Sequence, residues 1–346
     1  MPSYKQKPED FLVEEIALYD PDGEGGHCLV YVEKTGLTTQ QLVEELAARS
    51  GCVARDVGYA GRKDRWAVTR QWLSLPGVEP EEALSWQGES WSVLDAAPHR
   101  QKLRLGHLRA NRFRLQVRDV GESALQIGER LERAAAIGFP NRFGAQRFGR
   151  QGGNAEKARQ LLAGRLNLRQ RRKARFLISS LQSEAFNRVL ECRRELVPPI
   201  PGEMPWQRLV EGDVAQIVRS GGCFKVKDPG ADQSRLREGE IAVTGPIPGS
   251  KALRPGGSVG ALERRICEEV GCLPLLDGEV PRLRIDGARR ALAVRPMEAG
   301  CVVQGDVVEL AFNLPPGSYA TVLLEELFGE ELIDASRRFK GDPEQS

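Results

Sequence analysis

The sequence predicts an α+β protein with two domains. Segments in which apolar and polar residues alternate, as expected for strands, lie between segments whose apolar residues recur at helical spacing. The length of 346 residues exceeds what one compact core usually holds. After a long predicted helix at about 173–196, the chain becomes rich in glycine and proline as far as about residue 293, and we group this helix with that stretch. This change in composition favours a separate α+β domain within the chain.

The first 51 residues predict two strands and a helix. The apolar run that ends at Ile16 and the stretch His27–Val32 are the strands, and the glycine-rich turn 20–26 between them favours a hairpin. A capping box opens the helix at Thr38, and Gly51 ends it. The apolar stripe of this helix comprises Leu42, Val43, Leu46 and Ala47.

The stretch 57–74 follows and holds the most reactive combination of residues. Gly58 and Gly61 permit a sharp turn. From Ala67 to Leu75, β-branched and aromatic residues then predict a strand. We therefore expect Asp64 to lie on a loop at the edge of a sheet.

Asp64 is the candidate reactive group. Arg62, Lys63 and Arg65 flank it and would keep its carboxylate ionised. An ionised carboxylate can attack a sugar carbon or an electron-poor carbon of a base. The residues alone leave four roles open: covalent nucleophile, general base, metal ligand, or a turn residue that bonds its own backbone.

Several classes of site lack the residues they need. Asp56 is the nearest other acid to Asp64, and a metal-dependent nuclease requires more carboxylates than these two. The glycines before Asp64 lack the spacing of a P-loop, and no Ser or Thr follows Lys63 to bind magnesium. Seven cysteines without a Cys-x-x-Cys pair, together with three histidines, offer few zinc ligands and predict reduced, mostly buried thiols. We therefore expect no metal.

Positive charge is concentrated in one part of the chain. Residues 98–175 contain 20 Lys or Arg and 5 Asp or Glu, an excess of 15 in a chain of net charge +2, so the remainder carries −13. Such asymmetry indicates contact with a polyanion. In the predicted strand near residue 113, Phe113 alternates with Arg112 and Arg114, which places guanidinium groups on one face. We expect contact with phosphate, a solvated strand face being the alternative.

A second unusual segment follows a predicted helix at 122–137. Residues 138–149 contain three phenylalanines and two arginines among glycines. Aromatic rings beside cations are what a loop that handles RNA needs. The alternative is a loop whose aromatic side chains fill the core.

The rest of the chain predicts further helices and short strands. The helices span about 154–163, 173–196 and 259–270, with a closing helix to about Phe328. The strands lie near 213–218, 223–226 and 241–244, and the stretch 302–312 alternates again. A basic run at 169–175 precedes the longest helix.

Five segments recur in the order and form of one known family. Residues 58–71 have the form G-x-A-G-x-K-D-[KR]-x-A-V-T-x-Q. The others are Pro8–Phe11, Lys102–Gly106, Asn141–Gly149 and Leu314–Thr321. On these residues the chain resembles the TruD family of tRNA pseudouridine synthases, and the match covers nearly the whole chain.

The resemblance implies an isomerase that converts a uridine of tRNA, at position 13 in bacterial members, to pseudouridine. The glycosidic bond is broken, the uracil rotates, and it is rejoined through carbon. The resemblance makes Asp64 the nucleophile, whether it attacks the ribose or the base. Because the isomerisation involves no net redox change or group transfer, we expect no metal or organic cofactor.

The resemblance also assigns residues to substrate and RNA. A uridine must be extruded from a folded RNA to be reached, and both the flipped base and the vacated stack need aromatic cover. The candidates for binding the substrate are Phe11, Asn141, Phe143 and Tyr319, together with Lys5 as a partner for Asp64. The candidates for binding RNA are Arg112, Arg114, Arg142 and Arg147. Core packing, turn formation and a solvated terminus are the structural alternatives. Arg142 stands where family members often carry an aromatic residue, so a cation replaces one stacking surface.

The family architecture is a pseudouridine synthase catalytic domain with a central, largely antiparallel sheet, interrupted by an inserted α+β TRUD domain. The change in composition places the catalytic parts at 1–166 and 294–346 and the insertion at 167–293. The expected partner is tRNA, and the expected state is a monomer. Because no apolar run could span a membrane and no leader follows Met1, we expect a cytoplasmic location without a membrane partner.

Two other functions stay open. A non-catalytic RNA-binding or tRNA-chaperoning protein would depend on Arg112 and Arg114 and not on Asp64. A nuclease would require magnesium and would cleave the RNA chain.

Overall fold

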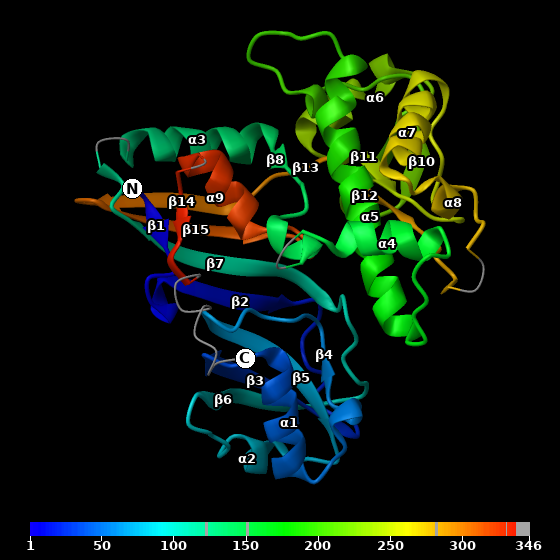
Figure 1. The fold of residues 1–346 in the computed structure, drawn as a ribbon. Coiled ribbons are helices and arrows are strands. Elements are labelled where there is room, and N and C mark those ends of the chain that lie inside the picture. The colour runs from blue at the N-terminus through cyan, green and yellow to red at the C-terminus, as the bar shows by residue number, and fades with distance from the viewer. Residues whose placement is uncertain (122–123, 150–151, 281–282, 330, 337–346) are drawn as a thin grey trace. The chain divides into compact units, whose positions relative to one another are not determined.

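The computed structural model describes residues 1–121, 124–149, 152–280, 283–329 and 331–336 (Figure 1). The chain divides into two compact units. Unit 1 comprises Met1–Ala135, Pro296–Ala320 and Leu324–Ser346, and unit 2 comprises Ala136–Arg295 with Thr321–Leu323. The expected insertion, 167–293, lies within unit 2, which begins earlier in the chain than the change in composition.

Unit 1 is built on one sheet. Its strands are β1 (Ser3–Tyr4), β2 (Phe11–Ala17), β3 (His27–Thr35), β4 (Gly58–Tyr59), β5 (Val68–Pro76), β6 (Trp91–His99), β7 (Leu108–Arg118), β14 (Met297–Gln304), β15 (Val307–Leu314) and β16 (Ile333–Asp334). The main path is β14-β15-β7-β2-β5-β3-β6. Within the described residues, the pairs β2–β5 and β1–β16 are parallel and the other neighbours are antiparallel. The prediction of an α+β protein with a central, largely antiparallel sheet is confirmed.

The predicted hairpin between the first two strands is wrong. β5 lies between β2 and β3, parallel to the former and antiparallel to the latter. β2 has β7 and β5 on its two sides, which leaves no edge for β3. β3 and β5 are both nine residues long and pair over their whole length, whereas β2 has seven. The turn 20–26 instead contacts the end of β6, where Gly23 N donates to Pro98 O at 3.1 Å.

The predicted first helix is confirmed as α1 (Thr39–Ser50). Thr38 Oγ1 accepts from Gln41 N at 3.2 Å, and Gly51 ends the helix with φ of 69°. Its apolar stripe is buried against β3 and β5. The other helices of this part are α2 (Pro80–Ala83), α3 (Ala124–Ile137) and α9 (Ala320–Phe328). The predicted start of α3 at residue 122 lies outside the described residues.

The pattern at two other places was misread. The stretch 302–312 is not one strand: it contains the end of β14, a turn at Gly305 with φ of 63°, and most of β15. The helix α6 (Pro229–Glu238) was not predicted. Asp228 caps it by accepting from two backbone N–H groups, and Gly239 ends it with φ of 80°. These capping residues were the available sequence signal.

Unit 2 surrounds one long helix. The helices are α4 (Asn154–Leu162), α5 (Arg171–Cys192), α6, α7 (Gly257–Val270) and α8 (Leu273–Leu276). The strands β10 (Cys223–Lys225), β9 (Val214–Ile217), β11 (Ile241–Ile247) and β12 (Ala288–Ala291) form a sheet in that order. α5 contributes to one core with α4, α7 and α8 and to a second core against this sheet. Of the described helices, neither α5 nor any other is long and apolar enough to cross a membrane.

The two ends of unit 2 lie side by side. β8 (Phe139–Pro140) pairs with β13 (Ala293–Val294) in an antiparallel two-stranded sheet. The chain therefore enters and leaves this unit at adjacent positions, which is the arrangement that an inserted domain requires.

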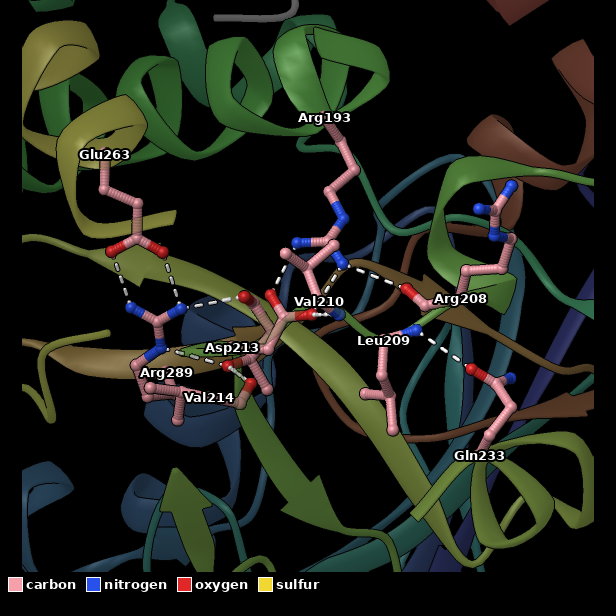
Figure 2. Close-up of polar contacts among 10 residues, drawn as sticks. Arg193, Arg208, Leu209, Val210, Asp213, Val214, Gln233, Glu263 and Arg289 are labelled. Carbon is pink, nitrogen blue, oxygen red and sulfur yellow. Dashed lines mark hydrogen bonds and ion pairs between the residues drawn. The ribbon is translucent and has the colours of Figure 1, made fainter. Parts of the chain in front are cut away.

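Two buried ion pairs connect the helices of unit 2 with its sheet (Figure 2). Arg193 binds both oxygens of Asp213, at 2.5 and 2.6 Å, and their side chains are 2% and 0% exposed. Arg289 binds both oxygens of Glu263, at 2.7 and 2.8 Å, and donates to Thr244 O at 2.7 Å. Bidentate pairs of this kind fix orientation as well as charge.

Replacing Arg193 by Met should lower the free energy of unfolding by about 3–5 kcal/mol, because Asp213 would stay buried without its counter-ion. Urea unfolding gives the loss, and hydrogen exchange of the β9 and β11 amides shows whether it falls in unit 2. The neighbouring exposed Arg194→Met is the matched control and should change stability by less than about 0.5 kcal/mol. Equal losses in the two variants would contradict the assignment.

Candidate active site

Asp64 lies on the loop between β4 and β5, as predicted, and its side chain is 48% exposed. The strand that follows it is interior to the sheet, between β2 and β3, rather than at an edge. The loop therefore starts where several strands end or begin. At this position an acidic side chain is exposed to solvent, and the packed sheet supports the loop that carries it.

Lys5 contacts Asp64 directly. Its Nζ donates to Asp64 Oδ2 at 2.9 Å, although the lysine side chain is only 2% exposed. The backbone of Lys5 has φ of 59°, a left-handed conformation that costs a non-glycine residue about 1–2 kcal/mol. Trp66 Nε1 donates to Lys5 O at 3.0 Å and holds this conformation. The structure thus brings together two residues that are 59 positions apart.

Phe11 lies beside the same ammonium. Lys5 Nζ is 4.0 Å from the centroid of its ring, within the range of a cation–π interaction. The ring is 3% exposed and contacts Phe113 edge-on at 6.2 Å. In this structure Phe11 supports Lys5 from the core side of the sheet.

Lys34, which the sequence analysis missed, holds the backbone of Asp64. It is fully buried, and its Nζ donates to Asp64 O at 3.1 Å and to Leu37 O at 2.6 Å. Burial lowers the pKa of Lys34 to about 8, and attraction to the Asp64 charge opposes that shift. Lys34 continues the buried positions of β3 after Val30 and Val32. A charged residue at such a core-facing position was the signal that could have identified it.

The Lys63 side chain points into the core, where it is not available to contact a phosphate group. Its Nζ forms an ion pair with Glu15 Oε2 at 3.2 Å and donates to Asn111 Oδ1. The two ionic side chains are 6% and 1% exposed. Burial raises the pKa of Glu15 and lowers that of Lys63, and their mutual attraction opposes both shifts. Because Lys63 N also donates to Thr39 Oγ1 at 2.8 Å, this residue anchors the loop.

Gly58 is required by close packing. A Cβ at this position would lie 2.4 Å from Ser74 Oγ and 2.5 Å from Leu103 O. Ser74 Oγ already accepts from Leu103 N at 2.9 Å, so this neighbour is fixed. Gly61 has no contact closer than 4.0 Å and does not carry the same constraint.

The basic face of β7 is partly neutralised. The predicted alternation is present, with Phe113 on the buried face. On the other face Arg112 lies 3.8 Å from Glu298 and Arg118 lies 2.6 Å from Asp10. Arg114 is exposed. This surface is therefore less positive than the sequence alone indicates.

The aromatic loop belongs to unit 2, and its polar groups are engaged there. Asn141 Nδ2 donates to Ala291 O at 3.0 Å, and its Oδ1 accepts from Arg290 Nη2 at 2.5 Å. The Phe143 ring meets Phe186 at 5.6 Å and has the Arg290 guanidinium 4.2 Å from its centroid. In this conformation the Asn141 amide is bound by protein groups at both ends.

The remaining candidates are half-buried. Arg142 and Arg147 also belong to unit 2, where Arg147 Nε donates to Ser183 Oγ at 3.1 Å. Tyr319 belongs to unit 1 and directly precedes α9, without a capping hydrogen bond from its side chain. The structure thus brings Asp64, Lys5 and Phe11 into contact, and the roles of all the candidates stay predictions.

Replacing Lys34 by Met should change how stability depends on pH. Because burial holds the pKa of Lys34 at about 8, below the usual 10.5, the folded chain loses this proton first as the pH rises. Between the two values the unfolded chain binds more protons, so folding becomes more favourable. The native protein should therefore gain up to about 3 kcal/mol over Lys34→Met between pH 7.5 and 10.5.

Urea unfolding of both proteins at several pH values measures this difference. The exposed Lys7→Met is the control, and its stability relative to the native protein should be independent of pH in this range. A difference between the native protein and Lys34→Met that stays constant would show that Lys34 is not perturbed by burial.

The chain is similar to known proteins over most of its length. The family model for tRNA pseudouridine synthase D (TruD) matches residues 3–167 and 166–327. A tRNA pseudouridine synthase D of Geotalea daltonii is 35% identical over 94% of this chain and 96% of its own length. One of Geobacter sulfurreducens is 35% identical over 94% and 93%. A Methanosarcina mazei protein solved as a candidate TruD shares the fold, with a TM-score of 0.72 at 24% identity over 96% of this chain and 94% of its own. The chain belongs to the TruD family of tRNA pseudouridine synthases.

Proposed function

We propose that this protein converts uridine 13 of tRNA to pseudouridine and that Asp64 is the nucleophile. The observation that carries the proposal is a half-exposed carboxylate held 2.9 Å from a buried ammonium, on a loop anchored from below. Solvent access lets the carboxylate reach a substrate carbon. The buried ammonium offsets its charge without covering it.

The other acids near the loop are less suited to this role. Glu15 is 1% exposed, is paired with Lys63, and has a raised pKa because of burial. Asp10 is fully buried and is paired with Arg118 at 2.6 Å. A nucleophile has to be both ionised and accessible. Asp64 is far more accessible than either neighbour and also has an ammonium 2.9 Å away.

The chemistry returns Asp64 to its starting state. Attack at the ribose would form a bond from Oδ to the sugar carbon as the glycosidic bond breaks, and attack at the base would form an adduct at a ring carbon. In the ribose route, C5 of the uracil displaces the carboxylate from the sugar carbon as the carbon–carbon bond forms. In the base route, the glycosidic bond of the adduct breaks, C5 bonds to the sugar carbon, and the carboxylate then leaves the ring carbon. In both routes C5 loses a proton and N1 gains one, so the reaction is balanced. Lys5 and Lys34 hold the carboxylate and its backbone throughout, which keeps the reacting oxygen in position.

The flipped uridine needs aromatic and polar contacts. We propose that Phe143, Tyr319 and Asn141 supply them and that Arg112, Arg114, Arg142 and Arg147 contact the RNA. Binding through the Asn141 amide would require it to exchange its partner Arg290 for the base. Phe11 is proposed to act on the substrate through Lys5. We also propose that unit 2 is the inserted TRUD domain.

Asp64→Asn should abolish pseudouridine formation and leave tRNA binding largely intact, because an amide is not a nucleophile of comparable strength. Mapping pseudouridine in a tRNA transcript after incubation with each protein gives the result. Asp95→Asn, which alters an exposed carboxylate on β6, is the control and should retain full activity. Full activity of Asp64→Asn would favour a different role for this residue.

Lys5→Met should lower kcat about tenfold or more with a smaller effect on KM, because a hydrogen bond between charged groups is worth about 1.5–3 kcal/mol. Steady-state kinetics with tRNA separates the two constants. Lys7→Met removes an exposed cation two positions away and should leave both constants unchanged. A rise in KM alone would instead assign Lys5 to RNA binding.

A tRNA transcript with cytidine in place of uridine 13 tests the position. It should accept no modification, while the unaltered transcript is converted. Modification elsewhere in the altered transcript would leave the synthase activity in place and reject the assigned position.

A further inference from the structure

A hollow of about 530 Å³ lies in unit 2 at the start of α5. The described residues that line it are four arginines and a leucine: Arg171, Arg172, Arg175, Arg284 and Leu283. Three of the arginines come from the first turns of α5, and the fourth comes from the segment before β12. Arg175 Nη2 donates to Arg284 O at 3.5 Å, which connects the two walls.

Positive charge accumulates around this hollow. Residues 165–175 contain six Lys or Arg and no Asp or Glu. Four guanidinium groups around one space repel one another, and an anion between them would relieve that repulsion. The start of α5 adds the partial positive charge of a helix N-terminus.

An exposed aromatic ring accompanies the arginines. Phe176 follows Arg175 directly and is 52% exposed. It lies four positions after Arg172 on α5, so the two side chains share one face of the helix. An exposed ring beside guanidinium groups forms a stacking surface for an unpaired base. This second feature favours RNA over a free phosphate ion, because a phosphate ion cannot stack on an aromatic ring.

We infer that this hollow binds the phosphodiester backbone of tRNA and that Phe176 stacks on an adjacent unpaired base. Guanidinium groups bind phosphate in a bidentate manner, which fixes the strand as well as attracting it. The inference rests on the proposed function for the identity of the RNA. It adds a contact in unit 2 that is separate from the candidates near Asp64.

The test is tRNA binding by the full chain at several salt concentrations. The variant Arg172→Gln/Arg175→Gln/Arg284→Gln neutralises exposed arginines of the hollow. Each lost phosphate contact should lower the slope of log Kd against log salt by about 0.7–0.9, so three should lower it by about 2–3. At 0.1 M salt the Kd should rise about tenfold or more.

A matched control removes the same charge elsewhere in unit 2. Arg194→Gln/Arg219→Gln/Lys227→Gln alters three exposed cations that do not line the hollow, and it should leave the slope unchanged. Phe176→Ala should weaken binding about fivefold or more with an unchanged slope, and Phe176→Tyr should restore it. Loss of affinity in the hollow variant and in Phe176→Ala, but not in the control, supports the site.

Two results would overturn the inference. Equal losses in the hollow variant and the control would reduce the effect to net charge, and an unchanged slope in both would place the RNA elsewhere. These measurements are independent of catalysis. If the native protein bound tRNA with the expected dependence on Arg172, Arg175 and Arg284 but formed no pseudouridine, the proposed function would fail and the site would stand.

Discussion

The burial of charge beneath the Asp64 loop is the constraint on which the rest of unit 1 depends. Lys5, Lys34 and Lys63 are nearly or fully withdrawn from water, and an unpaired charge in such a place costs several kcal/mol. Each ammonium is therefore given oxygen partners: a carboxylate for Lys5 and Lys63, and backbone carbonyls for Lys34. Those partners come from β2, the segment after β3 and the loop itself. Consequently the loop adopts one position only when the sheet beneath it has its native strand order.

That dependence explains which parts of the fold the sequence could predict. α1 carries its own signals, since a cap at Thr38, an apolar stripe and a terminal glycine all lie within one segment. The strand order β2-β5-β3 has no such local signal, because it depends on which strand of the chain pairs between two others. The residues of the turn 20–26 favour a hairpin between β2 and β3. In the structure β3 pairs instead with β5, which has the same length. The missed helix α6 shows a smaller limit: its caps were readable, but a glycine- and proline-rich composition concealed them.

The residues of the candidate site also divide into those that the sequence could identify and those that it could not. Asp64 was identified because it belongs to a recognisable motif, and Lys5 because the family resemblance names it as a partner for Asp64; their contact is present in the structure. Glu15, Lys34 and Asn111 were not, although each occupies a core-facing position of a strand where an apolar residue is expected. A charged residue in a buried strand position requires a partner from another strand, and the identity of that partner depends on register. The sequence can therefore identify such a residue as unusual, whereas only the structure shows which residue is its partner.

The number of cations along a segment is a poorer guide to RNA contact than the positions of those cations in the fold. The segment 98–175 has a large excess of cations, but Arg118 lies against Asp10, and Arg159 lies against Glu156 and Glu184. Such pairs have less positive potential to offer a polyanion, since each guanidinium already lies beside a carboxylate. The start of α5 differs because its basic run contains no acid and its arginines converge on one hollow with Arg284. The same residue type thus serves structure in one part of the segment and can serve recognition in another, and what separates the two uses is whether several guanidinium groups line one hollow.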